Sequence, residues 1–169
     1  MKRIVCLLLL IFTFLACPIA ANPMTLNGGV SASDRVPDGF FGSWKVMAVR
    51  AETTNSDMFA PYSVEIWNFT KTGNVITLTN PVSGAEASIT VTEAQSNTFT
   101  FQRKNLGDKN ETVVETAKLT LNGDNFLGLD TMDVKTYKNG MLIKHEYCAY
   151  TLKAVKLSGS DTGRIFGMK

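Results

Sequence analysis

Residues 111–155 read ETVVETAKLTLNGDNFLGLDTMDVKTYKNGMLIKHEYCAYTLKAV. Three runs rich in Val, Leu, Thr and Tyr alternate apolar with polar residues along this stretch. The turns between the runs, Asn122-Gly123-Asp124 and Asn139-Gly140, contain residues that tolerate the positive φ angles of tight hairpins. The stretch therefore predicts three consecutive antiparallel strands joined by two hairpins.

The same alternation extends upstream to Ser43, and no window shows the 3.6-residue apolar period of a helix. Turn clusters at 71–73 and 81–84 separate the runs. The expected strands cover residues 43–50, 62–69, 74–79, 87–93, 98–104, 111–121, 125–137 and 141–155. Because nearly all the connections are short, neighbouring strands are expected to pair antiparallel. The one long link, 51–61, is polar and is compatible with a short helix or a lid.

Each run has one apolar face and one polar face. In 98–103, for example, Phe99 and Phe101 alternate with Thr98, Thr100 and Gln102. This pattern is typical of a sheet closed over a core. We therefore expect an all-β fold, an eight-stranded antiparallel up-and-down barrel without exposed edges. A two-sheet β-sandwich uses the same number of short strands and is the alternative.

The N-terminus has the layout of a signal peptide. Lys2 and Arg3 precede an apolar run, 4–15, that is too short to cross a bilayer as a helix. Cleavage after Ala21 is the first interpretation. In the alternative, residues 14–17 form a bacterial lipobox, and Cys17 becomes the lipidated N-terminus of a membrane-anchored lipoprotein.

The expected organisation is a signal peptide (1–21), a flexible tail (22–42), the barrel domain (43–155) and a C-terminal tail (156–169). The tail assignment at 22–42 follows from its Gly, Ser, Asn, Asp and Pro content. The mature chain is expected to be periplasmic or secreted. Scattered aromatic residues, and lysines on the longest strands, predict that it has no membrane-spanning strands.

Charge and cysteine content restrict the partners. Of 17 basic residues two belong to the signal, so 15 remain against 15 acidic residues. A near-neutral chain has no basic surplus for binding nucleic acid. Cys148 is the one cysteine outside the signal region and cannot form an internal disulfide, so we expect it to be a small buried residue.

Gly42-Ser43-Trp44 opens the first expected strand. This tripeptide resembles the Gly-x-Trp motif of the lipocalin and wider calycin barrels, and the strand number and domain length are also similar. Thr131-Met132-Asp133 loosely matches the family's later Thr-Asp pair. The family's arginine that stacks on the tryptophan has no close counterpart, since Lys153 is not an arginine and Arg164 stands several residues late. The resemblance implies that Trp44 plugs the closed end of the barrel; a core tryptophan of any β domain is the alternative.

The residues predict no catalytic, metal or cofactor site. His145 is the single histidine, and Cys148 lies three residues away, so the two face opposite sides of a strand. Glu111 and Glu115 share a strand face, and we expect these and the other carboxylates, including Asp130, to be solvated. No glycine-rich phosphate-binding loop follows a strand.

An eight-stranded barrel is just wide enough to be filled by side chains or to hold one small ligand. The candidate lining residues are inward-facing and apolar: Trp44, Val46, Ile89, Val91, Phe99, Phe101, Leu119 and Leu121. The sequence thus predicts a non-enzymatic exported module that binds a small hydrophobic ligand in the cell envelope. The alternative is a filled barrel that acts on another envelope protein as an interaction or inhibitor module.

Overall fold

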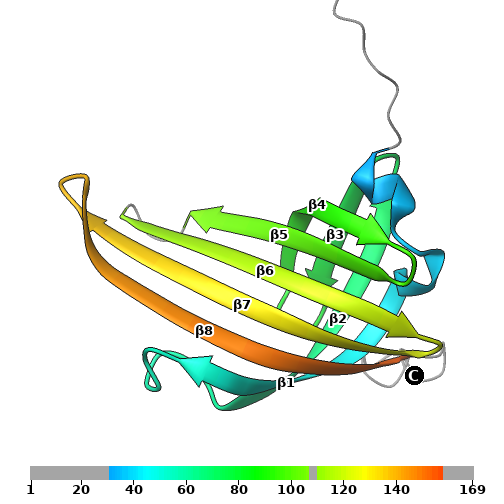
Figure 1. The fold of residues 1–169 in the computed structure, drawn as a ribbon, viewed down its shortest axis with the longest axis horizontal. Helices are drawn as coiled ribbons and strands as arrows, with labels where there is room; N and C mark the ends of the chain where they lie inside the picture. Colours follow the sequence, from blue (N-terminus) through cyan, green and yellow to red (C-terminus); the bar gives the residue numbers. More distant parts are fainter. Residues whose placement is uncertain (1–30, 107–109, 158–169) are drawn as a thin grey trace, which may run out of the picture.

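The computed structural model describes residues 31–106 and 110–157 of the chain. Two short 3-10 helices precede eight β-strands (Figure 1). The elements are η1 (Ala32–Arg35), η2 (Asp38–Phe40), β1 (Gly42–Thr53), β2 (Tyr62–Thr72), β3 (Val75–Asn80), β4 (Ala85–Gln95), β5 (Thr98–Leu106), β6 (Glu111–Asn122), β7 (Asn125–Lys138) and β8 (Met141–Lys156). Among the described residues, no helix is long and apolar enough to cross a membrane.

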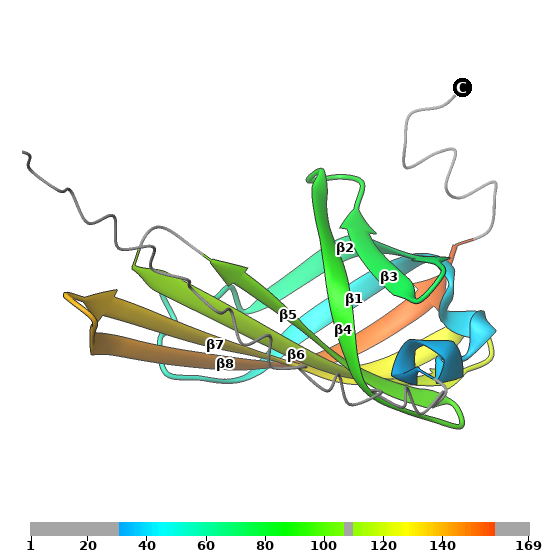
Figure 2. The ribbon, with the colours of Figure 1, turned by 90° about the horizontal axis from the view of Figure 1, so that it is seen from above.

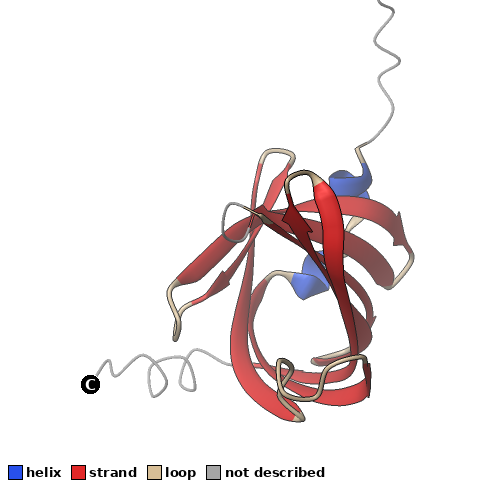
Figure 3. Cartoon of the chain, turned by 90° about the vertical axis from the view of Figure 1, so that its left-hand side faces the viewer, coloured by secondary structure: helices blue, strands red, loops and turns tan. Residues whose placement is uncertain are grey.

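The strands form one closed barrel in sequence order. Each strand pairs antiparallel with the next, and β8 pairs back onto β1. Figure 3 shows the resulting ring from one end, and Figure 2 shows the same strands from above. The predicted all-β up-and-down barrel is confirmed, and the β-sandwich is excluded.

The β7–β8 hairpin forms where the sequence predicts it. Asn139 has a φ of 52° and Gly140 a φ of 77°, and the pair joins Lys138 to Met141 across the ladder. Two successive positive φ angles match the twist of the flanking strands, so this turn sets the register of β8 against β7.

Aromatic side chains fill the end of the barrel next to η1 and η2. Phe40, at the end of η2, is completely buried, and its ring lies 4.6 Å from that of Phe99. Trp44 is also completely buried, 4.9 Å from the Phe126 ring, and its indole Nε1 donates a 2.7 Å hydrogen bond to the Phe40 carbonyl. This group of rings, the aromatic plug, closes one end of the barrel.

A lysine stacks on the tryptophan of the aromatic plug. Lys156 Nζ lies 5.3 Å from the centroid of the Trp44 ring and donates a 2.7 Å hydrogen bond to the Gly39 carbonyl. The contact ties the end of β8 to the segment before β1 through a cation–π interaction. The lysine that makes this contact is Lys156 and not Lys153, which is also on β8; Arg164 lies outside the described residues.

The expected flexible tail at 22–42 contains a packed part. Val36 and Phe40 are both buried, and Lys71 of β2 pairs with Asp34 at 2.9 Å. Residues 31–41 are therefore part of the folded domain, because their two apolar side chains cover the barrel end. The signal peptide, the remainder of the tail from residue 22, Cys17 and residues 158–169 lie outside the described residues.

Gly128 provides a stability test of the ring closure. A Cβ atom added there would lie 2.6 Å from Leu119 Cδ2 and 2.8 Å from the carbonyl oxygen of Lys118. The carbonyl belongs to the neighbouring strand and cannot move without opening the β6–β7 ladder. Gly128→Ala is therefore expected to lower the free energy of unfolding by about 1–3 kcal/mol in urea denaturation. Unchanged stability would contradict this close approach.

Candidate functional site

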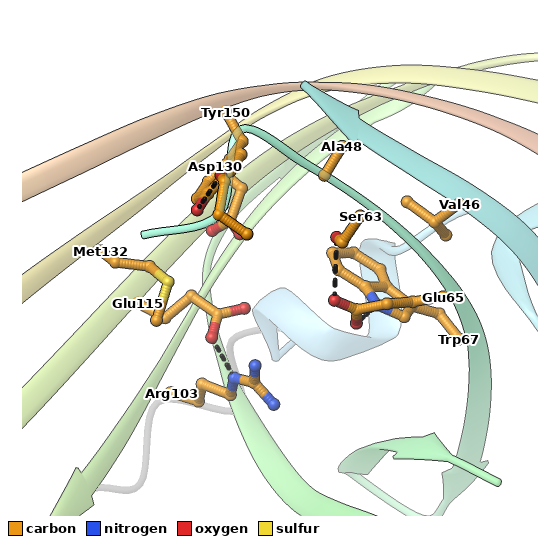
Figure 4. Close-up of a pocket in the computed structure, with 11 residues that line it drawn as sticks. Val46, Ala48, Ser63, Glu65, Trp67, Arg103, Glu115, Asp130, Met132 and Tyr150 are labelled. Atoms are coloured by element: carbon orange, nitrogen blue, oxygen red, sulfur yellow. Dashed lines mark hydrogen bonds and ion pairs between the residues drawn. The ribbon is translucent and has the colours of Figure 1, made fainter. Parts of the chain in front are cut away.

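A cavity of about 230 Å3 lies inside the barrel, beside the aromatic plug. Figure 4 shows that its walls carry both apolar and charged side chains. It is lined by Val46, Ala48, Ala60, Ser63, Glu65, Trp67, Arg103, Glu115, Asp130, Met132 and Tyr150. The barrel interior is therefore neither completely filled nor purely apolar.

Strand register brings three charged residues together on one wall of the cavity. Arg103 on β5 lies directly opposite Glu115 on β6. Asp130 on β7 lies opposite Ala117, two residues further along β6. Because side chains two residues apart on a strand share a face, Glu115 and Asp130 are diagonal neighbours inside the barrel.

The carboxylates have unequal hydrogen bonding. Arg103 Nε donates to Glu115 Oε2, and Glu65 on β2 accepts from Trp67 Nε1 at 2.9 Å and from Ser63 Oγ at 3.1 Å. Glu115 Oε1 and Asp130 Oδ1 are buried and have no hydrogen-bond partner among the described residues. The side chain of Glu115 is only 4% exposed. A buried acceptor without a donor is costly and rare in native proteins, so the two oxygens need an explanation beyond stability.

Burial changes the protonation of this cluster. The pKa of Asp130 is raised to about 8, because burial removes its carboxyl group from water and because the Glu115 carboxylate repels its charge. Burial also raises the pKa of Glu115, and Arg103 offsets only part of that effect. Asp130 is therefore largely protonated at neutral pH in the ligand-free barrel.

The raised pKa predicts how stability depends on pH. The unfolded chain releases the Asp130 proton near the ordinary pKa of 3.8, whereas the folded protein retains it up to about 8. The free energy of unfolding should therefore fall as the pH rises through this window. Asp130→Asn removes the titration, so at about pH 9 this variant should be more stable than wild type by about 2 kcal/mol or more.

Thermal unfolding of both proteins between about pH 4 and 9 measures this difference. Glu86→Gln is the matched control, because Glu86 is exposed on β4 and its removal deletes the same charge from the outer surface. Parallel pH profiles for wild type and Asp130→Asn would contradict the buried titration.

The β1–β2 loop bounds the cavity on the side away from the plug. Arg50 Nη1 donates to the carbonyls of Phe59 and, at 3.1 Å, of Ser56. The Tyr150 hydroxyl donates to the carbonyl of Ala60 at 3.1 Å, and burial raises the pKa of Tyr150 to about 12. Tyr150 therefore stays a proton donor at physiological pH. The expected link at 51–61 is shorter in the structure, since β1 continues to Thr53 and a turn without a helix follows.

The predicted lining residues mostly belong to the core rather than to the cavity. Val46 is the one that lines the cavity. Five others are buried in the hydrophobic core: Trp44, Ile89, Phe99, Phe101 and Leu119. Val91 and Leu121 are partly buried and pack against the core. The rings of Phe99 and Phe101 stack at 5.5 Å, so these two side chains pack against each other within the core.

The prediction of solvated carboxylates is wrong for Glu115 and Asp130, whose exposed fractions are 3% and 7%. The signal was present in the sequence, because Glu115 shares the apolar face of Ala117 and Leu119, and Arg103 shares the face of Phe101. A charged pair on facing strands can be buried when its charges compensate, and the pattern of one strand alone does not reveal this.

The remaining reactive residues lie apart. His145 is on the outer surface, with Nε2 2.8 Å from Asp133 Oδ2, and Cys148 is fully buried as expected. No group of three His, Cys, Asp or Glu side chains within 31–106 and 110–157 is arranged to hold a metal ion.

Comparisons of the chain with protein families, with curated proteins and with solved structures found no match. The function proposed below therefore rests on the geometry of the closed barrel and of its charged cavity.

Proposed function

We propose that this chain is a non-enzymatic binding protein that is exported to the cell envelope and holds one small ligand inside its barrel. The observation that carries the proposal is the cavity of about 230 Å3, whose lining includes Glu115 and Asp130, each with a buried carboxylate oxygen that has no hydrogen-bond partner among the described residues. An interior that served stability alone would avoid such groups, because each costs about 1–3 kcal/mol. A ligand that donates hydrogen bonds would recover part of this cost.

The size and lining of the cavity favour a small amphipathic ligand over a lipid-like one. An apolar cavity of about 150 Å3 holds benzene, so by proportion this cavity accommodates about nine non-hydrogen atoms. Trp67, Met132 and Val46 offer apolar contact, while the carboxylates offer polar contact. This revises the sequence-based expectation of a purely hydrophobic ligand.

The resemblance to remote lipocalin-like domains supports the same function. Trp44 of the Gly-x-Trp tripeptide lies in the aromatic plug at one end, and Lys156 stacks on it where the family has an arginine. A barrel closed at one end by a tryptophan and hollow beside it is the arrangement that the resemblance implies. Membership of that family is part of this proposal.

Native mass spectrometry of the mature protein, purified from the envelope of the cells that make it, tests the proposal. We expect an excess mass on the order of 100–200 Da, matching the cavity, that disappears on denaturation. Ala48→Phe places a ring in the cavity and should abolish the excess mass, whereas Thr151→Phe adds the same ring on the outside of β8 and should not. An apoprotein mass from wild type in the gentlest conditions would contradict ligand binding.

The same spectrum tests the proposed export. A chain that starts at Asn22 indicates simple cleavage of the signal peptide, and an acylated Cys17 indicates the lipoprotein alternative. An uncleaved chain that starts at Met1 would contradict both.

A second candidate function is a protein-interaction module. The β7–β8 hairpin projects beyond the other strands in Figure 1, and near its tip three successive apolar residues, Met141, Leu142 and Ile143, are 67%, 51% and 58% exposed. Exposed apolar groups of this kind are typical of contact sites. A second polypeptide that co-purifies with the wild-type protein but not with the Leu142→Lys variant would favour this function. Co-purification with both proteins would show that the hairpin tip is not the contact site.

A further inference from the structure

We infer that the ligand of the barrel cavity is a small organic cation, a primary amine with an apolar body of about nine non-hydrogen atoms, held between Glu115 and Asp130. The inference rests on the proposed function and adds the chemical class of the ligand. It starts from the two unpaired oxygens, Glu115 Oε1 and Asp130 Oδ1. Once Asp130 has released its proton, both oxygens are acceptors only, and a ligand that donates hydrogen bonds can then satisfy them.

The charge balance of the cavity selects a cation. The cavity lining contains three carboxylates, Glu65, Glu115 and Asp130, and among these charged residues a single guanidinium, Arg103, which is paired with Glu115 (Figure 4). With Glu65, Glu115 and Arg103 ionised, the lining has a net charge of minus one while Asp130 keeps its proton, and of minus two once Asp130 releases it. An anionic ligand would be repelled, and a neutral one would leave the carboxylates uncompensated in a low dielectric.

The hydrogen-bond inventory selects an ammonium over a metal ion. A primary ammonium has three N–H donors on one atom, enough for both unpaired oxygens and one further acceptor. A metal ion needs several ligands at fixed distances, and the carboxylates in the described ranges are not grouped in that way. Glu65 already accepts two hydrogen bonds, from Trp67 and Ser63, and serves as a more distant counter-charge.

The other walls fit the apolar body. The indole of Trp67 and the side chains of Met132 and Val46 surround the space beside the carboxylates. Tyr150 and Trp67 both have their polar atoms engaged, Tyr150 with Ala60 and Trp67 with Glu65, so they present their apolar surfaces. An aromatic or branched hydrocarbon body is the chemistry that such walls recognise.

Binding is coupled to proton release. Four other titratable or charged groups line the cavity with Asp130: Glu115 of β6, Arg103 of β5, Glu65 of β2 and Tyr150 of β8. Arg50 of β1 is not among the lining residues, because its guanidinium binds carbonyl groups of the β1–β2 loop. In the ligand-free protein the balance of these groups keeps Asp130 protonated up to about pH 8. An ammonium beside Asp130 favours the carboxylate, so the amine displaces a proton into solvent. Below the pKa of Asp130 the association constant should therefore fall by up to about tenfold per pH unit.

The test is isothermal titration calorimetry of the full mature chain with 2-phenylethylamine, and with the neutral 2-phenylethanol as its equally sized control. At about pH 8.5 the amine is expected to bind about tenfold to a hundredfold more tightly than the alcohol. Binding heats in buffers of different ionisation enthalpy should show proton release at pH 6.5, which gives way to net proton uptake by about pH 9.5, because part of the free amine is neutral there and gains a proton on binding.

Variants separate the outcomes. Asp130→Asn and Glu115→Gln should each weaken amine binding about tenfold or more without reducing the affinity for the alcohol, and Glu86→Gln on the outer surface should change neither. If wild type binds the amine and the alcohol with equal affinity, the proposed binding function stands, but the inference that the ligand is an amine is overturned. No binding of either compound by the folded wild type would overturn the amine and remove support from the binding function. The pH profile of wild type decides the question even if a variant does not fold.

Discussion

Arg103→Met is expected to lower the free energy of unfolding by about 3 kcal/mol or more at pH 8, because it leaves Glu115 buried without its partner. Arg103 Nε donates to Glu115 Oε2, and the Glu115 side chain is 4% exposed. Burial already raises the pKa of Glu115, and the loss of Arg103 raises it further. The folded protein then holds a proton that the unfolded chain releases, so the loss should be smaller at pH 5 than at pH 8.

A double variant distinguishes this mechanism from a simple loss of packing. Arg103→Met combined with Glu115→Gln removes both charges, so most of the stability at pH 8 should return. Lys135→Met is the control, because its ion pair with Asp133 at 3.0 Å is on the surface and its removal should cost less than about 1 kcal/mol. A double variant as unstable as Arg103→Met alone would contradict the account.

Trp44→Ala is expected to lower the free energy of unfolding by about 3–5 kcal/mol, the usual cost of removing a fully buried aromatic ring. The ring is 0% exposed and contacts Phe40 and Phe126 in the aromatic plug. Its Nε1 also donates to the Phe40 carbonyl, and the Lys156 ammonium lies over its face. Without the ring, Phe40 loses its contact with the indole and the hydrogen bond to its carbonyl, which are two of the contacts that attach residues 31–41 to the barrel.

Trp44→Phe keeps an aromatic ring but removes the donor, and it should cost about 1–2 kcal/mol. Urea denaturation of wild type and both variants measures the two losses of stability, provided that the m-value is the same for all three proteins. Protease resistance near residues 31–41 provides a second readout, because that segment should be cut first in Trp44→Ala. A cost below about 1 kcal/mol for Trp44→Ala would show that the plug does not depend on Trp44.

The strands could be predicted closely from local information. The expected run 111–121 became β6 (Glu111–Asn122), and 141–155 became β8 (Met141–Lys156), because alternation and the Asn-Gly turn act within a few residues. The register shift between Val91 and Glu93 in β4 was not foreseen. The shift inserts one extra residue into β4. Strict alternation after Val91 would place Glu93 on the inner face, but Ala94 is the residue that is buried there.

The candidate site could be predicted only in part, because it depends on contacts between distant strands. The alternation places Glu115 and Arg103 inward, but only the β5–β6 register shows that they face each other. Phe40 precedes β1 and Lys156 ends β8, and they meet at Trp44 only after β8 pairs with β1. Local patterns carry no information about that closure.

A carboxyl-carbon NMR titration of the ligand-free protein measures the protonation of Asp130 in the cavity. Asp130 lines the interior cavity together with Glu115, and we propose that a ligand replaces its proton there. We predict that Asp130 titrates with a pKa of about 8, and that 2-phenylethylamine lowers this value. A pKa near the ordinary 3.8 would mean that the carboxyl is solvated, and it would contradict the charged binding cavity.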